Sequence, residues 1–142
     1  MILIAAVDER YGMAFNKRRQ SSDRAVTGKI IGMARGSRLW MNAYTFKLFK
    51  DAQPADIRVD EDFLKKAGPG ELCFAETVSP GAYLAPEGQC QIERIVLFKW
   101  NRRYPGDVYF DIDLKRFNLI RSEDFAGSSH EKITMEIYEG RK

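Results

Sequence analysis

Short apolar segments separated by polar turns recur along the chain. The first, residues 2–7, is continuously apolar, which is typical of a strand covered on both faces. Shorter apolar runs at residues 38–41, 57–59 and 72–75 alternate with segments of helical spacing. This alternation predicts an α/β fold whose central sheet is mostly parallel.

The helical segments carry their own start signals. Apolar residues within 26–33 recur at i, i+4 and i+7, and Ser21 or Ser22 is the expected cap of this helix. Acidic residues at 60–62 predict the start of a second helix, because acids stabilise the positive end of the helix dipole. A further short helix is expected over residues 43–49.

The second half of the chain has the pattern of strands joined by turns. Residues 79–88 contain two prolines and two glycines and are expected to form a loop. Apolar and polar residues alternate in the last strand, which is therefore expected to bury one face and to extend the sheet in the antiparallel direction. The expected strands lie at residues 95–100, 108–112, 117–121 and 133–138.

The composition is that of an ordinary globular protein. With 142 residues, 44% hydrophobic and 30% charged, the chain fits a single domain over residues 1–142. A net charge of +3 gives little support to a dedicated nucleic-acid binder. Two cysteines, Cys73 and Cys90, favour a reducing compartment, with one bridge between them left open. The apolar N-terminal run has no basic leader and is too short to cross a membrane, so a cytoplasmic protein without a membrane partner is expected.

Several motifs resemble those of dihydrofolate reductase. Residues 4–8, followed by Gly12 and Met13, resemble the first strand and the mobile active-site loop of that family. Residues 41–46 resemble its Met-Gly-Arg-x-Thr-Trp turn. The segments that match best are 106–110, 122–125 and 133–141. The resemblance implies a shortened dihydrofolate reductase-like fold with a central mostly parallel sheet, flanking helices and an antiparallel C-terminal strand.

The resemblance also implies a site. The family holds NADPH against the pterin ring of folate and uses a carboxylate that pairs with the pterin edge. Asp23 matches the place of that carboxylate and is the catalytic candidate, although an Asp here also suits a helix cap. Thr45 is the candidate cofactor-binding residue, and its alternative role is that of a helix N-terminal residue.

The chain departs from the family pattern at most of the reductase site. The paired glycines that hold the cofactor pyrophosphate are replaced by a segment with Glu76, whose charge would repel a phosphate. Asn42 and Ala43 replace the Gly-Arg pair that normally meets the cofactor. Other family residues are replaced by Thr27, Asp56 and Phe98, with Arg58 close enough to Asp56 for a register shift to restore an arginine. Ordinary folate reduction is therefore not expected.

A basic polar loop precedes the first long helix, at the mouth of the same cleft. Guanidinium, amide and hydroxyl donors of this kind can hold a phosphate or a carboxylate. The candidate ligand-binding residues are Asn16, Arg18, Arg19, Gln20, Ser21 and Arg24. A second basic–aromatic group at residues 100–104 makes a nucleotide or a single nucleic-acid strand a further candidate. Solvated loops are the alternative interpretation of both groups.

His130 is the only histidine, so a clustered zinc site is not expected and no metal is predicted. Sequence motifs for phosphate-binding loops and serine-hydrolase elbows are absent from the chain. We expect His130 in a surface turn, with a general acid–base role as the alternative.

Three functions remain open, in this order. The first is binding of an anionic small molecule or nucleotide in the cleft. The second is an NADPH-dependent reductase with altered cofactor and substrate use. The third is a non-catalytic interaction module with an apolar patch around Trp100 and Tyr104.

Overall fold

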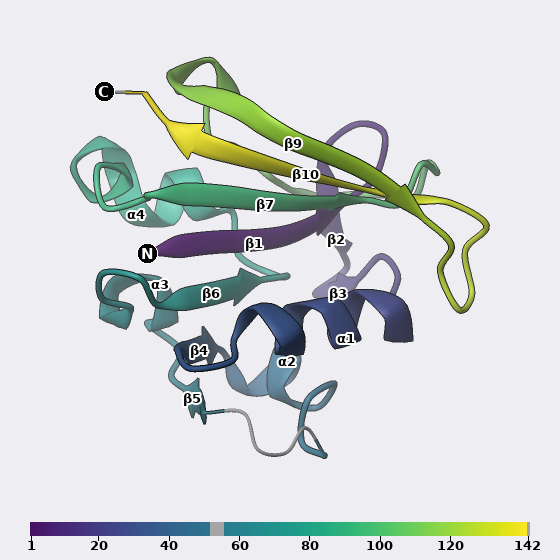
Figure 1. The fold of residues 1–142 in the computed structure, drawn as a ribbon, viewed down its shortest axis with the longest axis horizontal. Coiled ribbons are helices and arrows are strands. Elements are labelled where there is room, and N and C mark those ends of the chain that lie inside the picture. The colour runs from purple at the N-terminus through teal and green to yellow at the C-terminus, as the bar shows by residue number, and fades with distance from the viewer. Residues whose placement is uncertain (52–55, 142) are drawn as a thin grey trace.

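A seven-stranded sheet forms the centre of the computed structural model, which describes residues 1–51 and 56–141. Its strands are β1 (Ile2–Val7), β4 (Arg38–Met41), β5 (Asp56–Val59), β6 (Leu72–Ala75), β7 (Arg94–Lys99), β9 (Phe117–Phe125) and β10 (Ile133–Gly140). They lie in the order β5-β4-β6-β1-β7-β10-β9 (Figure 1). The five strands from β5 to β7 are parallel, and β10 pairs antiparallel with both β7 and β9. The expected α/β fold with an antiparallel C-terminal extension is confirmed.

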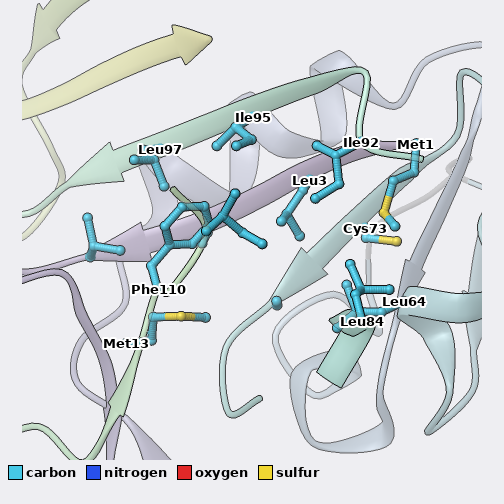
Figure 2. Packing of buried hydrophobic residues seen from close by; sticks show 14 of the residues in the cluster. Met1, Leu3, Met13, Leu64, Cys73, Leu84, Ile92, Ile95, Leu97 and Phe110 are labelled. Carbon is cyan, nitrogen blue, oxygen red and sulfur yellow. The ribbon is translucent and has the colours of Figure 1, made fainter. Parts of the chain in front are cut away.

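Helices cover both faces of this sheet. They are α1 (Arg24–Met33), α2 (Ala43–Phe46), α3 (Phe63–Lys66) and α4 (Pro80–Gln89), with a short 3-10 turn at Leu114–Arg116. Successive residues of β1 point to opposite faces, so Leu3 packs in one apolar cluster and Ile4 in the other. Figure 2 shows the cluster of Leu3, with Leu64 of α3 and Leu84 of α4. The other cluster holds Ile4 and Ile30 of α1.

A small second sheet carries the basic loop. Strands β2 (Gly12–Phe15) and β3 (Arg18–Arg19) form a hairpin, and β8 (Val108–Tyr109) pairs with β2 on its other side. The hairpin turns at Asn16 and Lys17, whose φ angles of 52° and 64° are those of a tight turn with two left-handed residues. From the sequence this segment was expected to be a loop, because a two-residue strand leaves almost no periodic signal.

Two further expectations are corrected. Residues 79–88 were expected to form a loop, but most of them belong to α4, which is interrupted at Ala85 (φ 58°, ψ 170°). The break explains why two prolines fit there: Pro80 lies at the start, where its missing N–H is not needed, and Pro86 follows the break. The cap of α1 is Asp23, which confirms the alternative interpretation of that residue, and neither Ser21 nor Ser22.

Polar or aromatic residues stand directly after four of the parallel strands. They are Asp8 after β1, Asn42 after β4, Glu76 after β6 and Trp100 after β7, and all four are buried. Open α/β sheets bind ligands outside the carboxyl ends of their strands. This edge of the sheet is therefore where a functional site is expected.

Candidate functional site

The most densely hydrogen-bonded side chain at this edge is the carboxylate of Asp23. It caps α1 by accepting from the backbone N–H of Ala25 at 2.8 Å. The loop between β9 and β10 supplies the other donors, namely the backbone N–H and hydroxyl groups of Ser128 and Ser129, at 2.9 to 3.1 Å. Gly127 lets this loop approach, since a Cβ there would lie 2.5 Å from Asp23 Oδ2.

These donors decide the charge of Asp23. Burial by itself raises the pKa of the carboxyl, but hydrogen bonds from Ser128, Ser129, His130 and Ala25 overcome burial and hold the pKa well below its usual range. Asp23 is therefore a fixed carboxylate at neutral pH. A carboxylate in this state accepts hydrogen bonds but has no proton to deliver, so the environment of Asp23 does not favour a role in proton delivery.

His130 connects Asp23 to a serine hydroxyl. Its Nδ1 lies 2.9 Å from Asp23 Oδ2, and its Nε2 lies 2.9 Å from the hydroxyl oxygen of Ser21. The hydroxyl of Tyr104 is 3.3 Å from the same Nε2, and the indole of Trp100 stacks on the imidazole with ring centroids 4.6 Å apart. The expectation of a surface turn was wrong, because His130 is only 6% exposed.

The bonding of His130 assigns its tautomer. An ionised carboxylate can only accept, so Nδ1 carries the proton that Asp23 binds. In the neutral imidazole Nε2 is then the acceptor, and the hydroxyls of Ser21 and Tyr104 lie within donating distance of it. The arrangement orients an imidazole lone pair at the Ser21 hydroxyl.

A second buried cluster surrounds Glu76. The guanidinium of Arg19 binds this carboxylate through Nε at 2.8 Å and Nη2 at 3.1 Å. The hydroxyl of Thr45 donates to Glu76 Oε1 at 2.8 Å, and the ring of Tyr44 lies 4.4 Å below the Arg19 guanidinium. Thr45 is completely buried, so its hydroxyl serves Glu76 and not the surface of the cleft.

The N-terminus of α4 is occupied by a side chain of the protein itself. Asp111 accepts from the backbone N–H of Gly81 at 2.5 Å and from that of Ala82 at 2.8 Å. A Cβ at Gly81 would lie 2.7 Å from the Asp111 carboxyl group, so glycine is required for this close approach. The helix end that could bind an anion thus already binds a carboxylate.

The six predicted ligand-binding residues make different contacts in the structure. Asn16 lies in the hairpin turn, where its backbone N–H donates to Asp107, and Arg19 is paired with Glu76. The Gln20 amide nitrogen donates to Asp8 at 3.3 Å and to the Pro105 carbonyl at 3.1 Å. Ser21 bonds to His130, while the side chains of Arg18 and Arg24 are exposed and make no hydrogen bond or ion pair within the described residues.

A hollow of about 320 Å³ opens beside the Asp23 cluster. It is lined by Ser22, Asp23, Arg24, Thr27, Leu48, Ser128 and Ser129. A larger hollow of about 890 Å³ lies toward the amino ends of β4 to β6, where its Arg38 is already paired with Asp56 and Glu71. Because the carboxyl edge of a parallel sheet and the dense polar cluster coincide, we place the candidate site at the smaller hollow.

The described residues contain no group of three or more His, Cys, Asp or Glu side chains that could hold a metal ion. Across the same ranges, no helix is both long enough and apolar enough to cross a membrane. Trp100, which was expected in an apolar surface patch with Tyr104, is instead 3% exposed and packs on His130.

Comparison with known proteins decides the fold. No protein-family model and no curated protein matches the chain. Dihydrofolate reductase from Enterococcus faecalis, solved in complex with NADP(H) and the ligand RAB-propyl, matches with a TM-score of 0.65. The match covers 99% of this chain and 96% of that one, at 11% sequence identity. The fold is that of dihydrofolate reductase.

Within this dihydrofolate reductase-like fold, Asp23 stands at the start of α1, and it stays a predicted catalytic residue. His130, for which an acid–base role was only the alternative to a surface turn, is the partner of Asp23 that the sequence did not reveal. Its contact with Asp23 joins positions 107 residues apart, and a lone histidine beside two serines carries no motif that could reveal such a contact.

Proposed function

We propose that the protein binds a small anionic ligand in the hollow beside Asp23, at the N-terminus of α1. The observation that carries the proposal is the exposed guanidinium of Arg24, which lines the hollow and is free of side-chain partners within residues 1–51 and 56–141. Ser22 adds a hydroxyl donor on the same wall. Guanidinium and hydroxyl donors of this kind favour phosphate or carboxylate groups.

The negative charge of Asp23 repels an anion in the hollow less strongly than the charge of an unbonded carboxylate would. Each of its oxygens already accepts from three donors, so the carboxylate is surrounded by positive hydrogen-bond dipoles. The volume of about 320 Å³ is near the lower end of small-ligand pockets, which favours a compact ligand over a whole dinucleotide.

One carboxylate argues against a nicotinamide dinucleotide held in the manner of the family. Asp111 already accepts from the backbone N–H groups of Gly81 and Ala82 at the start of α4. A pyrophosphate at α4 would have to displace Asp111 first. Ordinary folate reduction is therefore not part of the proposed function, and the role of Thr45 in cofactor binding stays a prediction.

A divergent NADPH-dependent reductase is the second candidate, favoured by the match to a dihydrofolate reductase solved with NADP(H). A ligand-dependent rise in melting temperature separates the two. We expect inorganic phosphate or a mononucleotide to raise the melting temperature, by an amount that decreases as salt is added. NADPH should raise it no more than these ligands do.

Two arginine variants locate the ligand. Arg24→Ala should abolish the stabilisation by phosphate, whereas Arg35→Ala, which removes a cation from the larger hollow, should leave it intact. If Arg35→Ala instead abolished the stabilisation by phosphate, the ligand would lie in the larger hollow. Stabilisation by NADPH alone would make the reductase the better function.

A further inference from the structure

We infer that Ser21, His130 and Asp23 form a nucleophilic relay that hydrolyses small carboxylic esters at Ser21. The order of contacts is that of a serine hydrolase: a carboxylate binds Nδ1 of an imidazole, whose Nε2 meets a serine hydroxyl. Both contacts measure 2.9 Å. The proposal concerns a chemical activity and does not depend on anion binding in the hollow.

Each member of the relay is held rigidly. Asp23 is fixed by α1 on one side and by the Ser128–Ser129 backbone on the other. The imidazole of His130 is stacked on the buried Trp100, so its plane cannot rotate freely. A general base works only when it is held in a fixed position beside the nucleophile, because a small misplacement of the reacting groups lowers the rate strongly.

Ser21 is reachable from solvent, while its two partners are buried. Ser21 as a residue is half-buried, whereas His130 and Asp23 are only 6% and 4% exposed. This difference in exposure lets a substrate reach the Ser21 hydroxyl and keeps water away from the Asp23 carboxylate. Among the described residues, the backbone N–H of Ser22, directly after the nucleophile, donates to no protein acceptor. In many serine hydrolases the N–H at this position helps to bind the oxyanion.

The reaction balances with water as the only co-reactant. The Ser21 oxygen bonds to the ester carbonyl carbon while its proton passes to His130 Nε2, which gives a tetrahedral oxyanion. The bond from carbon to the alkoxy oxygen then breaks, and His130 returns the proton to the departing alcohol. Water attacks the acyl-Ser21 group, passes a proton to His130, and releases the acid as Ser21 regains its proton. No atom is oxidised or reduced.

The hollow beside the relay indicates which esters fit. Ser22 lines it and is the neighbour of the nucleophile, so a group bound there lies next to the reacting carbonyl. The expected selectivity rests on the proposed anion site: esters that carry a carboxylate or phosphate near the scissile bond should be preferred. Arg24 would then set selectivity for charge, while the relay itself acts on neutral esters as well.

The same contacts can also be explained as a clamp that ties the β9–β10 loop to α1. The two explanations differ in what they predict for the Ser21 hydroxyl. A clamp leaves it as unreactive as any other serine, whereas a relay makes it a nucleophile. The direct test is therefore acylation of Ser21.

The experiment treats the full chain with an alkyl fluorophosphonate and, separately, with 4-nitrophenyl acetate, and maps the modified residue by peptide mass spectrometry. The fluorophosphonate bonds to the Ser21 oxygen with loss of fluoride and the hydroxyl proton. We expect modification at Ser21 that Ser21→Ala abolishes and that Ser122→Ala, which removes an exposed hydroxyl on β9, leaves unchanged. His130→Gln should slow acylation about 100-fold or more, which is the usual contribution of a general base.

Asp23 acts through His130 and is a positioning residue, so it needs a separate readout. In Asp23→Asn the imidazole loses the acceptor that fixes its tautomer, and acylation should fall even in protein that circular dichroism shows to be folded. A purely structural Asp23 would lower the melting temperature and leave the acylation rate of the folded fraction unchanged.

Charge selectivity is measured with the neutral acetate and the anionic hydrogen succinate esters of 4-nitrophenol. A preference for the succinate that Arg24→Ala removes and Arg35→Ala retains supports the anionic substrate class. Equal turnover of both esters at Ser21 would reject only the anion site. An unmodified Ser21, or equal modification of Ser21→Ala and the wild type, would reject the relay.

Discussion

The guanidinium of Arg19 grips the carboxylate of Glu76 through two parallel hydrogen bonds of 2.8 and 3.1 Å. Glu76 is 6% exposed, and the pair joins the β2–β3 hairpin to the end of β6, 57 residues away in the chain. The residue that the sequence analysis treated as an obstacle to phosphate is thus already neutralised. The contact ties the small sheet to the large one.

Removing one partner of this pair should be costly, because it leaves the other charge buried without compensation. We expect Arg19→Ala to lower the free energy of unfolding by about 2–3 kcal/mol, somewhat less than for a fully buried pair since the Arg19 side chain is 20% exposed. Chemical denaturation measures the effect. Arg58→Ala, which breaks a solvent-exposed pair with Asp56, is the matched control and should change stability little. Equal effects of the two substitutions would contradict a structural role for Arg19.

Two glycines should respond in opposite ways to alanine. In Gly81→Ala the new Cβ would lie 2.7–2.8 Å from the side chain and backbone of Asp111, so the start of α4 must shift and the protein should be destabilised. In Gly28→Ala the Cβ meets nothing within 4 Å on the exposed side of α1, and stability should rise by about 0.5–1 kcal/mol. The melting temperatures of both variants, compared with the wild type, test these expectations. A Gly81→Ala protein as stable as the wild type would show that Asp111 does not hold α4.

The sequence was sufficient for most of the large sheet. β1 was predicted with its observed bounds, because a continuous apolar run buried on both faces leaves a strong signal. The helix α4 was missed because its prolines and glycines have the composition of a loop, and only the break at Ala85 reconciles them with a helix. The β2–β3 hairpin was missed because it is short.

The site was less predictable than the fold. Asp23 was identified from the family resemblance and Ser21 from the basic loop, but both for roles other than a shared contact with His130. That contact, like the one from Asp111 to Gly81, joins residues distant in sequence, and no local pattern reports which long-range partner a polar residue will find. The buried polar residues that follow the parallel strands were a readable signal, since a charged or amide side chain directly after an apolar strand lies at the ligand-binding edge.

The two cysteines should differ in reactivity. Cys73 is buried in β6, and burial raises the pKa of its thiol to about 12, so almost no thiolate forms at neutral pH. Cys90 is exposed at the end of α4, and neither cysteine is in a disulfide. A thiol reagent should therefore modify Cys90 rapidly in the native protein and Cys73 only after denaturation. Cys90→Ser should abolish the rapid phase, and a rapid phase that survives in this variant would mean that β6 opens readily.

Acid should weaken the protein through Asp23. The folded-state pKa of this carboxyl lies well below the usual 3.8, because hydrogen bonds outweigh the effect of burial. The unfolded state therefore binds a proton at a higher pH than the folded state does, and the stabilisation by ionised Asp23 is fully present above about pH 5 and is lost as the pH falls below about 4.

Asp23→Asn removes this titration, so its unfolding free energy should fall below that of the wild type at neutral pH and approach it in acid. Urea denaturation at several pH values between 7 and 3, at constant ionic strength, measures the difference. Glu87→Gln, which neutralises an exposed acid on α4, is the control and should follow the wild-type curve closely. A difference between Asp23→Asn and the wild type that stays constant down to pH 3 would show that Asp23 stabilises the fold equally well when protonated, and that its charge has no part in holding His130.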